Sequence, residues 1–139
     1  MVDYAKLVPL AMKYARVLGP KAAKALPGLI PYLSKDPRAR KFVQDMSERA
    51  KKMSPRTKLS AQVALAREFA TEALTDQTSP ERQDVARAWL QRAKVLDMGV
   101  RTTANMPRKV ATARRAELAR QTDDLLAEII EALGQWSES

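Results

Sequence analysis

The sequence predicts an all-α protein: a five- or six-helix, mostly antiparallel bundle with a proline-interrupted N-terminal helical arm. The 139 residues include 23 alanines and 15 leucines but only three isoleucines and seven aromatic residues. Alanine and leucine favour helices, whereas β-branched and aromatic residues favour strands. Three Asp-Pro or Ser-Pro pairs also stand where helices are expected to begin. A hydrophobic content of 45% supports one core and argues against disorder.

The chain divides into two predicted parts, an arm or hairpin over 1–34 and a helical bundle over 35–139. In the arm, apolar residues recur on one face between Tyr4 and Leu18. Pro20 is placed to open a second short helix, which the prolines at 27 and 31 interrupt within two turns. Whether the arm packs onto the bundle is left open by the sequence.

Capping residues directly before prolines mark three helix starts in the bundle. The pairs are Asp36-Pro37, Ser54-Pro55 and Ser79-Pro80. An Asp or Ser oxygen accepts an unpaired backbone N–H, and proline suits the first helical position because it has no N–H. The predicted helices cover 37–53, 55–75 and 80–97. Gly99 is predicted to end the third helix, with continuation towards Ala104 as the alternative.

A final, acidic amphipathic helix is predicted from about Pro107 to Leu133, with Gly134 as a left-handed C-terminal stop. Its length would be about 40 Å, longer than the diameter of a small globule. Apolar residues at helical spacing give the predicted core, which consists of Phe42, Val43, Met46, Val63, Phe69, Val85, Trp89, Leu96, Leu125, Ile129 and Leu133.

Composition argues against catalysis. The chain has no histidine and no cysteine, so a catalytic triad, an imidazole base and a structural zinc site are excluded. Its four glycines are too scattered for a phosphate-binding loop. We therefore expect no enzyme activity, cofactor, metal or small-molecule substrate. An acidic stripe of Glu68, Glu72 and Asp76 is a docking strip or hard-cation site at most, and a solvated face is the favoured interpretation.

Uncharged stretches are short, which predicts a soluble protein. The longest, residues 25–34, has half the roughly 20 residues of a membrane-spanning helix. The absence of cysteine is consistent with a reducing compartment, so we expect a cytoplasmic location.

Charge is the main indication of function. The net charge is +9, divided into +10 over 1–60, −1 over 61–100, +5 over 101–120 and −5 over 121–139. This division favours a non-catalytic interaction or adaptor protein that binds a partner protein, or itself, through a basic N-terminal face and an acidic, apolar C-terminal face. The partner-helix candidates are Leu125, Leu126, Ile129, Ile130, Leu133 and Trp136. Packing of this seam within the chain is the alternative.

Nucleic-acid binding is a second hypothesis, since arginines recur every seven residues at positions 101, 108 and 115. The candidate phosphate-binding residues are Arg101, Arg108, Lys109, Arg114, Arg115 and Arg120. Pro107 interrupts this row, and no aromatic residue lies within it for base stacking. Binding would therefore tolerate different sequences of DNA or RNA. A solvated basic face is the alternative.

Peripheral binding to an anionic membrane surface is a third hypothesis, which rests on residues 1–34. Basic side chains there oppose an apolar face that carries two tyrosines. The candidate membrane-surface residues are Lys6, Lys13, Arg16, Tyr4 and Tyr14. The alternative is that this apolar face packs into the protein's own core.

Overall fold

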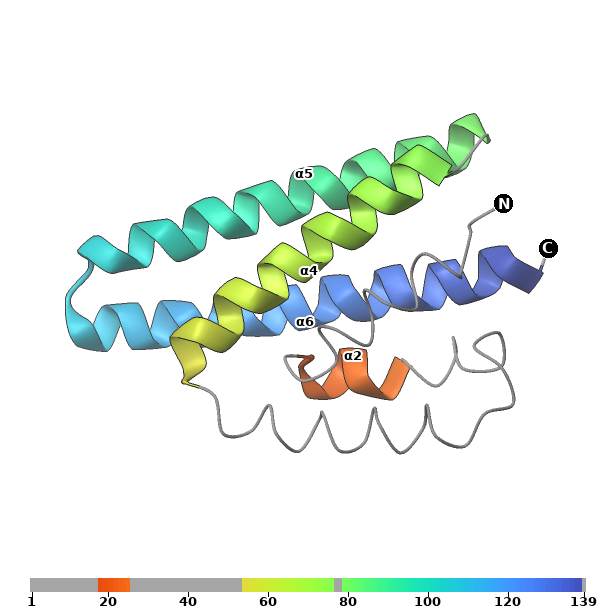
Figure 1. The fold of residues 1–139 in the computed structure, drawn as a ribbon. Helices are drawn as coiled ribbons and strands as arrows, with labels where there is room; N and C mark the ends of the chain where they lie inside the picture. The colour runs from red at the N-terminus through yellow and green to blue at the C-terminus, as the bar shows by residue number, and fades with distance from the viewer. Residues whose placement is uncertain (1–17, 26–53, 77–78, 139) are drawn as a thin grey trace.

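The computed structural model describes residues 18–25, 54–76 and 79–138, and this part of the chain is helical without a strand (Figure 1). The elements are α2 (Pro20–Ala25), α4 (Pro55–Asp76), α5 (Pro80–Thr102), the 3₁₀ turn η3 (Thr103–Asn105) and α6 (Arg108–Glu138). The predicted all-α class is confirmed for these residues. The helix predicted over 37–53, with its core positions Phe42, Val43 and Met46, lies outside the described residues. The predicted number of five or six helices therefore stays a prediction.

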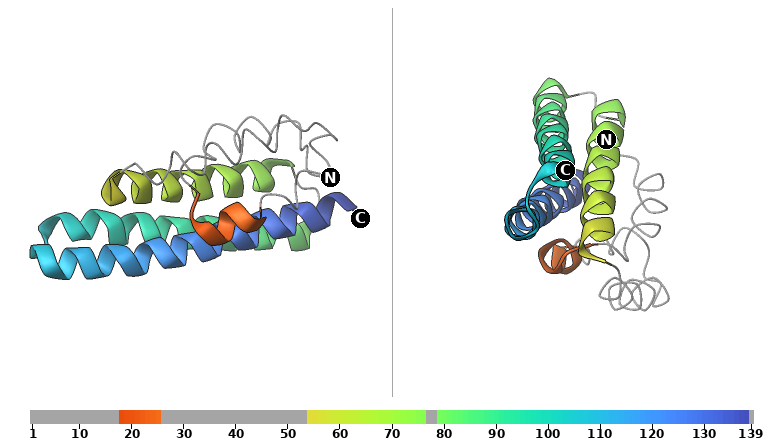
Figure 2. Two further views of the ribbon diagram at one scale, coloured as in Figure 1. Left: turned by 90° about the horizontal axis from the view of Figure 1, so that it is seen from below. Right: turned by 90° about the vertical axis from the view of Figure 1, so that its left-hand side faces the viewer.

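The helices α5 and α6 form a long antiparallel hairpin joined by η3 (Figure 1). The helix α4 packs across one face of this hairpin and contacts both of its arms. The short helix α2 packs against α6 (Figure 2). Among the described helices, α2, α4 and α5 therefore all pack against α6.

Serine caps begin two helices where the sequence predicts them. The Ser79 hydroxyl accepts a hydrogen bond from the Arg82 backbone N–H at 3.4 Å, and Pro80 is the first residue of α5. The Ser54 hydroxyl accepts one from the Thr57 backbone N–H at 3.3 Å at the start of α4. The predicted short helix from Pro20 is also present as α2.

Both predicted glycine stops are wrong. The helix α5 continues past Gly99 to Thr102, the alternative that the sequence left open. A Cβ atom on Gly99 would lie 2.9 Å from Cδ2 of Leu118, so this glycine serves the close approach of α5 to α6 rather than a turn. The helix α6 likewise runs through Gly134, which is buried, and ends at Glu138.

In the described part of the chain, the core is one apolar cluster to which α2, α4, α5 and α6 contribute. Its largest fully buried side chains are Phe69, Leu59, Leu65, Leu118, Leu125, Leu126, Ile129, Ile130 and Leu133. The predicted core positions Val63, Phe69, Trp89, Leu96, Leu125, Ile129 and Leu133 are confirmed as buried. Val85 is wrong, since 41% of it is exposed. The buried stripe of α5 passes through Ala86 instead, about 100° around the helix from Val85.

A carboxylate of α6 caps the start of α2. Asp123 is buried and accepts hydrogen bonds from the backbone N–H groups of Lys21, at 3.0 Å, and Ala22, at 2.9 Å. A Cβ atom on Gly19 would collide with the same carboxylate. The neighbouring Asp124 pairs with the Lys21 ammonium at 2.9 Å. Residues 18–25 of the predicted arm are therefore fastened to the bundle.

Removal of the Trp89 side chain should strongly destabilise the protein. Trp89 is 2% exposed, and its indole N–H donates to Glu128 at 2.9 Å. We expect Trp89→Ala to lower the free energy of unfolding by about 3–5 kcal/mol, measured by urea denaturation. The control Val85→Ala removes an exposed side chain from the same helix and should cost less than about 1 kcal/mol. Similar losses in the two variants would contradict the placement of Trp89.

Two adjacent aspartates provide a matched test of the α2 cap. Asp123→Ala leaves two backbone N–H groups without their charged acceptor, so we expect a loss of about 2–3 kcal/mol in the free energy of unfolding. Asp124→Ala removes only a surface ion pair and should cost less than about 1 kcal/mol. Urea denaturation of both variants measures the difference. Equal losses would show that Asp123 does not cap α2.

Candidate functional site

The end of the α5–α6 hairpin is uniformly basic. Residues 98–116 contain five basic side chains and no acidic one. Four of the five, Arg101, Arg108, Lys109 and Arg114, are exposed. We call these four residues the basic tip. Arg101 lies in the last turn of α5, whereas the other three lie in the first two turns of α6.

Pro107 creates this arrangement by separating the two helices. The chain leaves α5 at Thr102, passes through η3 and an extended residue at Met106, and enters α6 directly after Pro107. The predicted interruption of the arginine row at Pro107 is therefore confirmed. Arginines that are seven residues apart in sequence lie on two antiparallel helices and meet at the hairpin end. The N-terminus of α6 is the positive end of its helix dipole and adds to the positive potential here. No acidic residue in the first turn of α6 offsets it.

Arg115, a predicted phosphate-binding residue, instead faces into the hairpin. Its Nε donates a hydrogen bond at 3.2 Å to the hydroxyl of Thr103, which is buried. The same hydroxyl donates to the backbone carbonyl of Val100 at 2.6 Å. Arg115 thus joins α6 to the last turn of α5 and to η3, and it holds the basic tip in place.

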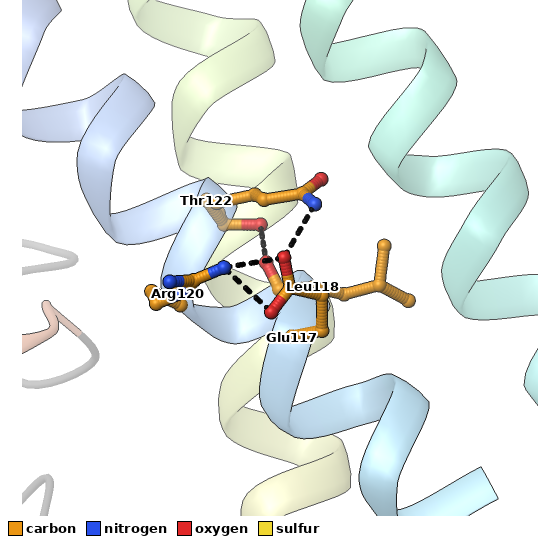
Figure 3. Close-up of polar contacts among 5 residues, drawn as sticks. Glu117, Leu118, Arg120 and Thr122 are labelled. Carbon is orange, nitrogen blue, oxygen red and sulfur yellow. Dashed lines mark hydrogen bonds and ion pairs between the residues drawn. The ribbon is translucent and has the colours of Figure 1, made fainter. Parts of the chain in front are cut away.

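Arg120, another predicted candidate, is paired within its own helix (Figure 3). Its Nη2 donates to both carboxylate oxygens of Glu117, at 2.6 and 2.7 Å, and Gln121 donates to the same carboxylate at 3.0 Å. These hydrogen bonds, from Arg120 first and then from Gln121, lower the pKa of Glu117. The carboxylate correspondingly raises the pKa of Arg120. The charge of Arg120 is therefore largely offset by its neighbour.

Arg101 is held more loosely than Arg120. Its guanidinium lies 3.1 Å from Asp97, and the side chain remains 76% exposed. Asp97 is shared, since it also lies 3.8 Å from Arg67 of α4. For Arg108, Lys109 and Arg114, the described part of the chain contains no ion pair within 4 Å.

The partner-helix candidates of α6, which we call the C-terminal seam, pack within the chain. This is the alternative to binding a partner helix that the sequence left open. Its apolar members Leu125, Leu126, Ile129, Ile130 and Leu133 are each 0% exposed. Trp136 is partly buried, and its ring stacks on Trp89 with centroids 5.2 Å apart. The guanidinium of Arg82 lies 5.3 Å from the Trp136 ring. This seam is therefore not a free apolar face for a partner helix.

The remaining candidates lie elsewhere. Lys6, Lys13, Arg16, Tyr4 and Tyr14 lie outside the described residues, as does the side chain of Asp76.

Glu68 and Glu72 are partly buried on α4, beside Arg67 and Thr71. The described residues hold no group of three or more side chains that would bind a metal. None of the described helices combines the length and apolar character needed to cross a membrane.

Two features of the hairpin were missed from the sequence. Glu128 of α6 accepts hydrogen bonds from both Trp89 and Arg92, so one carboxylate joins the two helices. A groove of about 370 Å³ also runs between α5 and α6, lined by Gln91, Arg92, Val95, Leu96, Gln121 and Asp124. Comparisons with known proteins find no matching family model, curated protein or solved structure.

The pKa of Glu117 distinguishes the paired Arg120 from Arg108, a member of the basic tip. Because the Arg120 hydrogen bonds are the largest cause of the lowered pKa, we expect Arg120→Ala to raise the Glu117 pKa towards the ordinary value of 4.5. Arg108→Ala, at the tip, should leave it unchanged. Carboxyl-carbon NMR between pH 2 and 7 measures both values. A Glu117 pKa insensitive to Arg120→Ala would contradict the pairing.

Proposed function

We propose that this protein is a non-catalytic nucleic-acid-binding protein that contacts phosphate groups through its basic tip. One observation carries the proposal: an exposed hairpin end with four basic side chains, in a 19-residue stretch, 98–116, that has no acidic residue. Such a surface attracts polyanions and gains free energy by releasing their condensed counterions. The absence of histidine and cysteine supports a binding role rather than a catalytic one.

The chemistry of the tip favours contacts with the phosphate backbone over contacts with bases. Residues 98–116 contain no aromatic side chain, so stacking on unpaired bases is not available there. Arginine and lysine contacts to phosphates position a protein on nucleic acid but carry no sequence information by themselves. We therefore expect affinity that varies little with sequence and depends strongly on salt.

Burial of the C-terminal seam reduces the support for the adaptor hypothesis in its original form. The acidic helix α6 has already used its apolar face against the other helices. A protein partner would have to bind elsewhere on the bundle. The basic tip, by contrast, needs no rearrangement of the core to reach a phosphate.

Salt dependence tests the proposal directly. With about four phosphate contacts, the affinity for duplex DNA should fall about 100-fold between roughly 50 and 200 mM salt. The double variant Arg108→Ala/Lys109→Ala should reduce the slope of log K against log salt by about 2. Fluorescence anisotropy with a labelled 20-base-pair duplex measures both quantities. An RNA hairpin and anionic vesicles, tested in parallel, identify the preferred polyanion.

A charge-matched control separates the tip from net charge. Lys24→Ala/Arg120→Ala removes two basic residues outside the tip, one exposed on α2 and one paired with Glu117. We expect this variant to keep most of the affinity and slope. Equal losses in the two double variants, or an affinity that does not change with salt, would refute the proposal. Binding to vesicles but to neither nucleic acid would also refute it.

A further inference from the structure

A second basic surface adjoins the basic tip, on the edge of α5 that is turned away from α6. Lys94 marks this edge, because it lies about 200° around α5 from Arg92, which pairs with Glu128 of α6. Arg101 follows seven residues later, about 10 Å further along the helix and within about 20° of the same direction. Both side chains are exposed. Because Arg101 also belongs to the basic tip, the two surfaces are continuous.

Helix α4 packs against α5 and adds a third basic side chain to this edge (Figure 1). Asp97 of α5 lies 3.1 Å from the guanidinium of Arg101 and 3.8 Å from that of Arg67 on α4. One carboxylate is therefore shared by two guanidinium groups, which leaves one positive charge in excess. Both arginine side chains remain accessible to a ligand, since 45% of Arg67 and 76% of Arg101 is exposed. We call Arg67, Lys94 and Arg101 the basic edge.

Lys94 contributes its full charge to the basic edge. In the part of the chain that the structure describes, no carboxylate lies within 4 Å of its ammonium group. Asp97, three residues further along α5, is already held by the two guanidinium groups. Arg87 lies seven residues before Lys94, but it pairs with Asp84 at 2.8 Å and is not counted here. The basic edge thus combines three basic side chains with one acidic neighbour.

The opposite flank of the hairpin would repel a polyanion. From residue 117 to residue 138, α6 contains six acidic side chains and one basic side chain. That basic residue, Arg120, is paired with Glu117. A polyanion that extends beyond the basic tip therefore meets negative charge along α6 and positive charge along the basic edge. This difference gives the bound polyanion one favourable direction.

The chemistry of the edge favours a duplex over a single strand. Helices α4 and α5 contain one aromatic residue each, Phe69 and Trp89, and both are buried. Neither helix therefore presents a ring on which an unpaired base could stack. A duplex carries one negative charge per about 1.7 Å of its axis, twice the linear charge density of one of its strands. Lysine and arginine contacts consequently gain more from counterion release on a duplex.

We propose that a nucleic-acid duplex bound at the basic tip continues along the basic edge, where Arg67, Lys94 and Arg101 contact its phosphates. The inference rests on the proposed function and adds to it a second contact surface, a direction and a preference for double-stranded nucleic acid. From Arg101 to Lys94 the edge lengthens the contact surface by about 10 Å, which corresponds to about three base pairs. Contacts at Arg67 and Lys94 should add about 2 to the salt slope of the tip alone.

Two matched double variants of the full-length protein test this path. Arg67→Gln/Lys94→Gln removes the two members of the basic edge that lie outside the tip. We expect it to weaken binding to a labelled 20-base-pair duplex and to reduce the slope of log K against log salt by about 2. The control Arg92→Gln/Arg120→Gln removes the same charge from arginines that pair with carboxylates of α6, and it should keep most of the affinity and slope.

Lys94→Gln alone separates binding from stability. It breaks no ion pair of the described residues, so it should melt at the wild-type temperature while reducing the salt slope by about 1. This single variant decides the outcome if the double variant is less stable than the wild type. A 20-nucleotide single strand, measured by fluorescence anisotropy in parallel, should bind more weakly than the duplex.

The outcomes distinguish failure of the path from failure of the proposed function. Duplex binding that is lost in Arg108→Ala/Lys109→Ala but unchanged in the edge variants would overturn the path and leave the tip as the binding site. Equal losses in the edge variant and its control would also overturn the path, because net charge would then be responsible. A single strand bound more tightly than the duplex would overturn the preference for a duplex. Failure of the wild-type protein to bind either nucleic acid would overturn both proposals.

Discussion

Burial of the apolar face of α6 is the constraint on which the rest of this structure depends. Leu125, Ile129 and Leu133 are fully buried, and α6 contacts α2, α4 and α5. An amphipathic helix has one apolar stripe, and the stripe of α6 between Leu118 and Leu133 is buried within the chain. The acidic residues on the remaining surface of α6 therefore determine what the helix can offer to other molecules, and they offer charge rather than apolar area.

Local ion pairs decide which charges are available to a partner. Arg120 and Arg108 contribute equally to the net charge of the sequence. Arg120, however, donates hydrogen bonds to both carboxylate oxygens of Glu117, whereas Arg108 begins α6 with no acidic residue in the same turn. Arg115 is a third case, since its hydrogen bond to Thr103 is part of the hairpin turn. Residues of one chemical type thus divide into a paired, a structural and an exposed class. Only the last can add to an external electrostatic field without first breaking a contact.

For the described residues, local sequence patterns were sufficient to predict the helix starts and most of the core. The Ser-Pro pairs act through caps that involve only neighbouring residues, and the seam of α6 follows from its apolar spacing. The prediction that Gly99 ends a helix was wrong because this glycine is required by its close contact with Leu118, which lies on another helix. The prediction that Val85 is buried was wrong because neighbouring residues of a helix point in different directions, and here Ala86 rather than Val85 points into the core.

Long-range partners explain what the sequence did not predict at the site. Asp123 caps α2 from 102 residues away in the chain, and no local pattern indicates such a pair. The sequence grouped the tip residues with Arg115 and Arg120 in one row that Pro107 interrupts, whereas the structure holds those two arginines in contacts within the chain. Pro107 converts this row into a cluster at the hairpin end, because it separates α5 from α6 and lets the chain reverse. The residue types were therefore predictable, whereas their juxtaposition required the fold.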